Sequence, residues 1–204
     1  MRVLVACEYS GRVRDAFRER GHDAWSCDLL PTESDPTFHY QCPVEDVLGK
    51  GWDLMVAHPP CTYLANSGAK HLYLGMKKEN GRNEERWERM QEAAKFFRSL
   101  LEADIQKIAI ENPVMLGYAN TLVGQKFTQS IQPWQFGHKE VKRTCLWLKN
   151  LPPLVPSHNV YDEMMKLPYG ERAKVHHEAP SVDRWKNRSR TYTGIAKAMA
   201  EQWG

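Results

Sequence analysis

The fold class is decided by the stretch MRVLVACEYSGRVRDAFRERGHDAWSCD, residues 1–28. Residues 3–7 form a continuous apolar run, and the Ser-Gly pair at 10–11 supplies turn residues. Apolar residues at helical spacing follow over 13–21, and residues 24–28 form a second short run that ends in an acid. This order of strand, turn, helix and strand is a βαβ unit, which predicts a parallel sheet.

Two further strands are predicted to end in polar residues. The apolar run 53–57 stops at His-Pro-Pro-Cys, 58–61, because two prolines cannot continue a strand's hydrogen-bond ladder. An amphipathic helix over 84–102 precedes the apolar run 105–110, which stops at Glu-Asn-Pro, 111–113. Since parallel strands end at one edge, we expect an open α/β sheet with its ligand site beyond these carboxyl ends.

The last third of the chain is predicted to complete one domain. Residues 144–148 indicate a strand, 151–156 an extended connector and 195–203 a closing helix. A chain of 204 residues with 42% hydrophobic residues can bury one substantial core but not two. We therefore expect a single domain, 1–204, with a short basic insertion at about 154–190.

Composition excludes several classes of protein. No apolar run approaches membrane-spanning length and no secretion signal is present, so we expect a soluble, cytoplasmic protein with no membrane partner. Five cysteines at irregular spacing argue against a disulfide framework and leave room for a reactive thiol. His39 and Cys42 have the spacing of only half a zinc site, so no metal is expected.

Charge decides little by itself, because the formal net charge is only +3. Basic residues are nevertheless gathered in two segments, about 67–82 and 166–190, with aromatic residues between them. Such segments can bind nucleic-acid phosphates, although ordinary solvated surface is the alternative. The predicted nucleic-acid contacts are Ser67, Lys70, Lys77, Lys78, Arg184, Lys186 and Arg188.

Cys61 is the candidate nucleophile. A cysteine in a rigid turn at a strand end is poorly placed for packing and well placed to meet a ligand, although a tight loop with a buried thiol would have the same sequence. Glu111 changes the balance, because a carboxyl group at a neighbouring strand end can hold or protonate a heterocycle that the thiol attacks. Two convergent groups predict a catalytic site.

In this order of motifs the chain resembles the DNA cytosine-C5 methyltransferases, as a compact member similar to phage and bacterial enzymes. The motifs that carry the likeness are Cys7-Glu8-Tyr9-Ser10-Gly11, Asp28, Asp46, Pro60-Cys61, Ser67-Gly68, Glu111-Asn112-Pro113, Lys142-Arg143-Thr144 and Thr193-Gly194. The resemblance implies a Rossmann-like fold that binds S-adenosylmethionine, with a mostly parallel twisted sheet and helices on both faces. The residues implied in cofactor binding are Glu8, Tyr9, Ser10, Gly11, Asp28, Asp46, Pro59 and Gly194.

The resemblance also implies a mechanism. The Cys61 thiolate would add to carbon 6 of cytosine and make carbon 5 nucleophilic enough to accept a methyl group. Glu111 would hydrogen-bond the ring nitrogen and exocyclic amine, Arg143 would fix the base, and Asn112 would position the loop. The expected partner is DNA with a flipped-out or single-stranded cytosine, as in restriction-modification or phage DNA modification, in bacterial or host cytoplasm.

The sequence departs from the family in several places. The first motif has one glycine, with Arg12 and Arg14 beside it, and a carboxylated derivative of the cofactor is an alternative donor. A second family arginine is Val141 here, and Pro113 replaces a valine. The family's target-recognition domain would have to fit between about 153 and 190, which is too short for a domain. Sequence specificity is therefore low, unnecessary or supplied by a separate partner.

Three other functions stay open on the sequence. A free pyrimidine nucleotide as substrate would explain the missing recognition domain. An amino-methyltransferase motif resembles His58-Pro59-Pro60-Cys61, although both of its ends differ and Glu111 is then unexplained. A non-catalytic DNA-binding relative would retain Cys61 without using it.

Overall fold

A single seven-stranded sheet forms the centre of the molecule in the computed structural model, which describes residues 1–204 except the side chain of His176. The strands lie in the order β3-β2-β1-β4-β5-β7-β6, and β7 runs antiparallel to both of its neighbours. All other pairs are parallel, which confirms the mostly parallel α/β sheet. The strands are β1 (Arg2–Ala6), β2 (Asp23–Asp28), β3 (His39–Gln41), β4 (Leu54–Ala57), β5 (Lys107–Pro113), β6 (Gln129–Ile131) and β7 (Thr144–Lys149).

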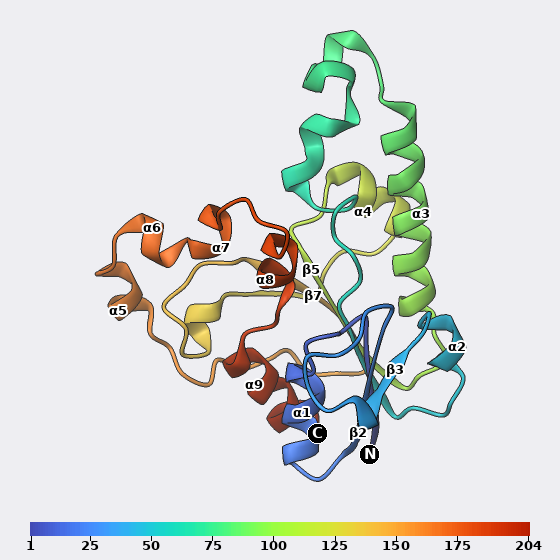
Figure 1. Ribbon diagram of the computed structural model, residues 1–204, viewed down its shortest axis with the longest axis vertical. Helices are drawn as coiled ribbons and strands as arrows, with labels where there is room; N and C mark the ends of the chain where they lie inside the picture. The colour runs from blue at the N-terminus through green and yellow to red at the C-terminus, as the bar shows by residue number, and fades with distance from the viewer.

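Helices cover both faces of this sheet, as expected of a Rossmann-like fold (Figure 1). Along β1, Leu4 and Ala6 belong to one core cluster, and Val3 and Val5 belong to the other, because successive side chains point to opposite faces. Helices α2, α3 and α4 pack on the first face, and α1 and α9 pack together on the second. The helices are α1 (Arg12–Glu19), α2 (Glu45–Leu48), α3 (Glu84–Leu101), α4 (Gly117–Val123), α5 (Tyr161–Met165), α6 (Tyr169–Arg172), α7 (Lys174–His177), α8 (Arg184–Ser189) and α9 (Thr193–Trp203).

The apolar runs seen in the sequence are the strands at the centre of the sheet. All four residues of β4 are buried, as are Val3 to Ala6 of β1. Strands covered on both faces need apolar side chains at successive positions rather than alternate ones. At the turn after β1, Gly11 has φ +73°, and a Cβ there would lie 2.7 Å from the Cβ of Ser34, so only glycine fits.

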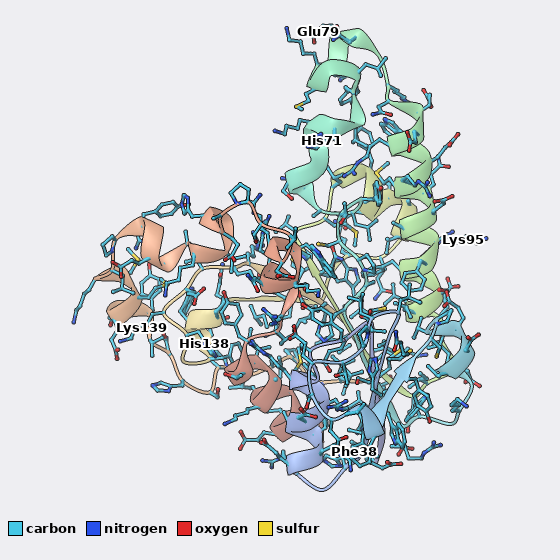
Figure 2. All side chains as sticks on the ribbon, viewed as in Figure 1. Phe38, His71, Glu79, Lys95, His138 and Lys139 are labelled. Atoms are coloured by element: carbon cyan, nitrogen blue, oxygen red, sulfur yellow. The ribbon has the colours of Figure 1, made fainter. Side chains whose placement is uncertain are left out.

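Residues 62–82, which we call the arm, extend away from the sheet beside the first turns of α3 (Figure 1). The arm is built from short 3₁₀ turns at Asn66–Leu72, Leu74–Met76 and Lys78–Asn80. Figure 2 labels His71 and Glu79 on it, with Glu79 near its far end. Asn83 then caps α3, since its side-chain oxygen accepts a hydrogen bond from the backbone N–H of Arg86 at 3.3 Å.

The predicted basic insertion at about 154–190 folds as an extended connector followed by α5 to α8 (Figure 1). Its last part returns to the carboxyl edge of the sheet, where the hydroxyl of Tyr9 donates to the carbonyl oxygen of Lys186. Within the part of the chain that the structure describes, no helix is both long and apolar enough to cross a membrane.

Candidate functional site

Some of the predicted site residues line a cavity of about 130 Å³ beyond the carboxyl ends of β1, β4 and β5. Strand β1 lies between β2 and β4, so the chain passes to opposite sides of β1 at this point. Open α/β sheets bind ligands at such a switch in strand order. The cavity is lined by Cys7, Glu8, Tyr9, Ser10, His58, Pro59, Pro60, Cys61, Glu111, Pro113, Lys142, Arg188, Ser189, Arg190 and Thr191.

The loop after β1, which lines one side of the cavity, is held in place by a buried carboxylate. Glu8 accepts hydrogen bonds from the backbone N–H of Val13 at 2.8 Å and of Arg14 at 3.2 Å, and from the hydroxyl of Ser10 at 3.1 Å. Its negative charge therefore sits at the amino terminus of α1, where helix N–H groups are otherwise unpaired. Cys7, just before it, has φ +57°, a conformation that usually requires glycine. The turn is fixed by Glu8 despite its single glycine.

Cys61 lies in a tight turn directly after β4. Its carbonyl oxygen accepts hydrogen bonds from the N–H groups of Leu64 at 3.0 Å and Ala65 at 2.8 Å. Burial raises the pKa of the Cys61 thiol, and the negative charge of Glu111 raises it further, while Lys142 opposes the shift. The thiol is therefore protonated at rest, and its reactivity depends on the charges that face it.

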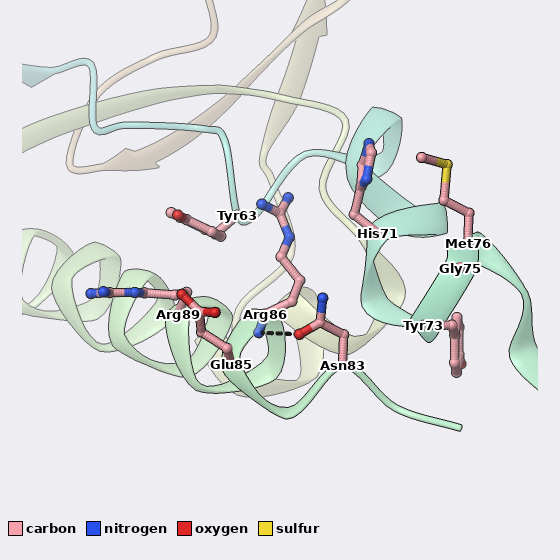
Figure 3. A pocket seen from close by; sticks show the side chains of 9 residues that line it. All are labelled: Tyr63, His71, Tyr73, Gly75, Met76, Asn83, Glu85, Arg86 and Arg89. Atoms are coloured by element: carbon pink, nitrogen blue, oxygen red, sulfur yellow. Dashed lines mark hydrogen bonds between the residues drawn. The ribbon is translucent and has the colours of Figure 1, made fainter. Parts of the chain in front are cut away.

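Arg86 of α3 anchors the chain just beyond Cys61, which the sequence did not indicate. Its Nη2 donates to the carbonyl oxygen of Thr62 at 2.5 Å, and its guanidinium lies 4.3 Å from the ring centre of Tyr63. A Cβ at position 68 would come within 2.7 Å of this Nη2, so the glycine of the Ser67-Gly68 motif permits the close approach. Figure 3 shows the Arg86 side chain between Tyr63 and His71.

Glu111 on β5 is paired with His58 at the end of β4. The Nδ1 atom of His58 lies 3.0 Å from Oε2 of Glu111, and the two side chains are only 10% and 13% exposed. Burial raises the pKa of Glu111, but the hydrogen bond from His58 and the positive charges of Lys142 and His58 outweigh it and leave the pKa below its usual range. Glu111 is therefore an ionised carboxylate with a histidine beside it.

Of the neighbours Lys142 and Arg143, the structure brings Lys142 to the cavity, which Arg188 and Arg190 also line. The side chain of Arg143 is exposed and lies 5.9 Å from the ring centre of Phe127, outside the cavity. Lys142 lines the cavity and donates from Nζ to the carbonyl oxygen of Arg188 at 2.8 Å. Because neighbouring residues in extended chain point to opposite sides, only one of the pair can face the site.

Asn112 faces away from Glu111, toward the other side of the sheet, as the pleat of β5 requires. It is only 1% exposed, and neither polar atom of its amide has a hydrogen-bond partner among the residues that the structure describes. The residues before it that share its face, Ile108 and Ile110, belong to the same core cluster as Leu64 in the turn after Cys61. If Asn112 positions the loop after Cys61, as predicted, it therefore acts from the face of the sheet that Leu64 packs on, and not from within the cavity.

Asp28, Asp46 and Gly194, which are expected to bind the cofactor, lie in different surroundings. Asp28 ends β2 and does not line the cavity, but its charge acts on Cys7, which does. Burial raises the pKa of Asp28, although its carboxylate accepts the backbone N–H of Leu30 at 2.9 Å. Asp46 is exposed in the first turn of α2, whereas its neighbour Glu45 is one of the charges that act on Cys7. Gly194 does not line the cavity; a Cβ there would overlap the carbonyl oxygen of Phe136, so this glycine is needed for packing.

Residues 184–191, which we call the strap, close the cavity opposite the strand ends. The hydroxyl of Tyr9 donates to the carbonyl oxygen of Lys186 at 2.8 Å, and Arg12 donates to that of Thr191 at 2.9 Å. The side chain of Arg190 donates two hydrogen bonds to the carboxylate of Glu33, at 2.8 and 2.6 Å. The predicted phosphate contacts Arg184, Lys186 and Arg188 all belong to the strap, but only Arg188 lines the cavity.

The remaining predicted DNA contacts lie on the arm, apart from the cavity. Ser67, Lys70, Lys77 and Lys78 are all exposed. Between the arm and α3 is a second, more open hollow of about 400 Å³ (Figure 3). It is lined by Tyr63, His71, Tyr73, Gly75, Met76, Asn83, Glu85, Arg86 and Arg89. Aromatic rings and guanidinium groups together suit a nucleic-acid strand, but this hollow contains none of the predicted catalytic residues.

His39, considered above as a metal ligand, and Arg14, considered as a cofactor contact, both make hydrogen bonds within the protein. Both ring nitrogens of His39 are taken, Nδ1 by the hydroxyl of Ser26 at 2.8 Å and Nε2 by the carbonyl oxygen of Leu30 at 2.9 Å. Arg14 is completely buried, and its Nη1 donates to Ser26 and to the carbonyl oxygen of Asp35. Arg14 is therefore committed to the protein interior rather than free to meet a carboxylated donor.

Comparison with known proteins gives distant likenesses only. No family model matches the sequence, and no curated protein matches it. A solved structure described as a "putative DNA modification methyltransferase encoded within prophage" from E. coli is 13% identical with a TM-score of 0.47, over 78% of this chain and 51% of that one. The Entamoeba histolytica methyltransferase EhMeth is 13% identical with a TM-score of 0.44, over 78% and 57%. The chain thus spans about half the length of these proteins, and likenesses this distant carry no argument about activity.

Proposed function

We propose that the protein transfers a methyl group from S-adenosylmethionine to carbon 5 of cytosine in DNA, with Cys61 as the nucleophile. The observation that carries the proposal is that Cys61 and Glu111 line one cavity at the switch point of the sheet, with Lys142 beside them. Nucleophilic attack at carbon 6 of a pyrimidine requires a thiol, a carboxyl group and a cation.

The turn after β1 and the end of β2 supply groups suited to the cofactor. Tyr9, Ser10 and Pro59 line the cavity, and Asp28 at the end of β2 offers a carboxylate for ribose hydroxyls. S-adenosylmethionine, when bound, would supply an electrophilic methyl group. A cavity of about 130 Å³ is smaller than the roughly 300–1,000 Å³ typical of small-molecule sites, so the strap has to move before a nucleoside can be admitted.

The residues of this chain would act in a defined order. The thiolate of Cys61 adds to carbon 6, and the ring's electron density then increases at carbon 5. Glu111 holds the ring nitrogen and the exocyclic amine, and Lys142 stands in for Arg143 as the cation that fixes the base. Lys142 also opposes the rise in the pKa of Cys61 that burial and Glu111 cause. Carbon 5 would then take the methyl group, and loss of the carbon-5 proton to solvent water with elimination of Cys61 would restore the aromatic ring and the thiolate.

DNA is the proposed macromolecular partner, bound as a single strand or with its cytosine flipped out. Arm residues Lys70, Lys77 and Lys78 and the strap's basic side chains would contact phosphates on either side of the cavity. We propose that residues 1–204 work as one domain in which 154–190 replaces a target-recognition domain. Low sequence specificity, or a separate specificity partner, and a cytoplasmic location would follow.

The test compares two substrates with methyl-labelled S-adenosylmethionine, single-stranded DNA and dCMP, for the wild type, Cys61→Ser and Cys145→Ser. Cys145 is a buried cysteine of β7 and serves as the matched control. We expect label in DNA with the wild type and Cys145→Ser, and loss of transfer with Cys61→Ser by about 10⁴-fold or more. Label in dCMP alone would show that the substrate is a free nucleotide and not DNA. Undiminished transfer by Cys61→Ser would contradict the covalent mechanism.

A further inference from the structure

His58 is a buried, titratable residue that the likeness in motifs leaves without a role, since the Pro-Cys motif assigns only Pro60 and Cys61. It lines the cavity, and its side chain is only 10% exposed. Its Nδ1 faces Glu111 at 3.0 Å, while its Nε2 has no hydrogen-bond partner anywhere in the described chain. A buried polar nitrogen left unpaired at a ligand cavity calls for an explanation beyond packing.

Charges from three other segments face His58. Glu111 comes from β5, Glu8 from the loop after β1, and Lys142 from the residues before β7. Burial lowers the pKa of His58, but the hydrogen bond and charge of Glu111, with that of Glu8, outweigh burial and Lys142, so that the pKa lies above its usual value. The pair at rest is therefore an imidazolium donating to a carboxylate, and it stores one proton next to Cys61.

This resting state conflicts with the proposed reaction unless the proton moves. The ring nitrogen N3 of cytosine carries a lone pair, so it accepts a hydrogen bond and needs a donor opposite it. An ionised carboxylate accepts hydrogen bonds and cannot donate one. Glu111 can therefore engage N3 productively only when a proton reaches the pair from a neighbouring group.

We propose, resting on the cytosine-C5 function above, that His58 is the proton store that lets Glu111 protonate N3 as Cys61 attacks. The Cys61 thiol first releases its proton to solvent water. The thiolate then forms the sulfur–carbon 6 bond, and the electron pair of the carbon 5–carbon 6 double bond is delocalised through carbon 4 toward N3. His58 passes its Nδ1 proton to Glu111, Glu111 passes this proton on to N3, and the pair is left as a neutral His58 beside an ionised Glu111. The thiolate loses one negative charge and the imidazolium loses one positive charge, so the net charge of the site does not change.

His58 is thus a positioning residue that acts through Glu111, and its role predicts a particular pH dependence. As pH rises through the raised pKa of His58, the stored proton is lost and adduct formation slows. As pH falls, Cys61 remains a thiol and adduct formation slows as well. A hydrogen bond that merely held Glu111 in place would produce no alkaline loss tied to His58.

The experiment measures covalent adduct formation with single-stranded DNA in which every cytosine is 5-fluorocytosine, with S-adenosylmethionine, between pH 6 and pH 10. The fluorine cannot leave as a cation, so the adduct with Cys61 persists and can be counted on a denaturing gel. Substituting every cytosine removes the need to know a target sequence. His58→Asn keeps an amide N–H near the position of Nδ1 but cannot hold a proton.

We expect adduct formation by His58→Asn to fall about 100-fold at pH 8, the size of a general-acid contribution, and its optimum to move to lower pH, where Glu111 binds a proton unaided. A wild-type pH profile in His58→Asn would overturn the proton-store role and leave the cytosine-C5 function standing. No adduct with the wild type at any pH would overturn both. Because His58→Asn can fail to fold, nuclear magnetic resonance of the wild-type histidine rings is the second measurement. A neutral His58 at the optimum pH for adduct formation would also overturn the role.

Discussion

Arg190 and Glu33 form a two-point ion pair, with Nε to Oε2 at 2.8 Å and Nη2 to Oε1 at 2.6 Å, that fastens the strap across the loop after β2. The two residues are far apart in the sequence, and they meet because the chain returns from its last short helix to the edge of the sheet. The pair closes the side of the cavity where the cofactor is proposed to bind. We therefore expect this pair, together with the hydrogen bonds from Tyr9 and Arg12 to the strap, to hold the cavity closed.

Arg190→Ala should speed cofactor association. The pair is partly exposed, so losing it should favour the open strap by about two- to fivefold. We expect the association rate of S-adenosylmethionine, followed by stopped-flow fluorescence, to rise by that factor. Because the hydrogen bond from Arg190 lowers the pKa of Glu33, acid should open the strap only below the usual range of a carboxyl group. The control is Arg89→Ala, which breaks an exposed pair with Glu92 on α3; an unchanged rate in Arg190→Ala would contradict the strap's role.

Gly194→Ala should destabilise the fold rather than merely weaken cofactor binding. A Cβ there would overlap the carbonyl oxygen of Phe136, which forces α9 to shift. We expect the free energy of unfolding, from urea titration, to drop by about 1–3 kcal/mol. Gly170→Ala in α6 is the matched control, because its Cβ meets no described atom within 4 Å, and it should change stability by about 0.5–1 kcal/mol in the stabilising direction. Equal stability of the two variants would contradict the packing role.

 The sequence predicts those parts of the fold whose signal lies in neighbouring residues. Apolar runs ended by prolines predict β4, and helical spacing predicts α3 and α9, because these patterns need no partner from elsewhere in the chain. Strand β5 extends through Glu111 to Pro113, beyond its apolar run, since it pairs antiparallel with β7. Such long-range pairing leaves no local pattern.

The same limit explains what the sequence missed at the site. Nothing in neighbouring residues distinguishes Lys142 from Arg143, because only the direction of the chain entering β7 decides which side chain faces the cavity. The partner of His58 lies 53 positions away, and that of Tyr9 lies 177 positions away. The strap and the proton pair are therefore properties of the tertiary fold alone.

Alkylation of Cys61 should report the charge of Glu111. Burial and the Glu111 carboxylate both raise the pKa of this thiol, and only the thiolate reacts with iodoacetamide. We expect Glu111→Gln to move the pH midpoint of Cys61 alkylation downward, and Lys142→Met to move it upward, because Lys142 lowers that pKa. Peptide mass spectrometry separates Cys61 from Cys42, which does not line the cavity and serves as an internal control. A midpoint in Glu111→Gln that is unchanged or higher would contradict this effect of the carboxylate on the thiol.

The arm should contribute electrostatic affinity for DNA. Lys77 and Lys78 are exposed on it, and each phosphate contact releases bound counterions. We expect the double variant Lys77→Glu, Lys78→Glu to bind single-stranded DNA more weakly, with the slope of log affinity against log salt reduced by about 1.4. Lys95→Glu, on the exposed side of α3, is a charge-reversal control outside the arm (Figure 2). A slope that changes no more in the double variant than in the control would place the DNA elsewhere.

The most direct test of the account is the identity of the modified nucleoside. DNA is incubated with the protein and S-adenosylmethionine that carries a trideuterated methyl group, then digested to nucleosides and analysed by mass spectrometry against standards. We expect trideuterated 5-methyl-deoxycytidine from the wild type and none from Cys61→Ser. Deuterated methyl on an exocyclic nitrogen of cytosine or adenine, or an unlabelled cytosine pool, would contradict it.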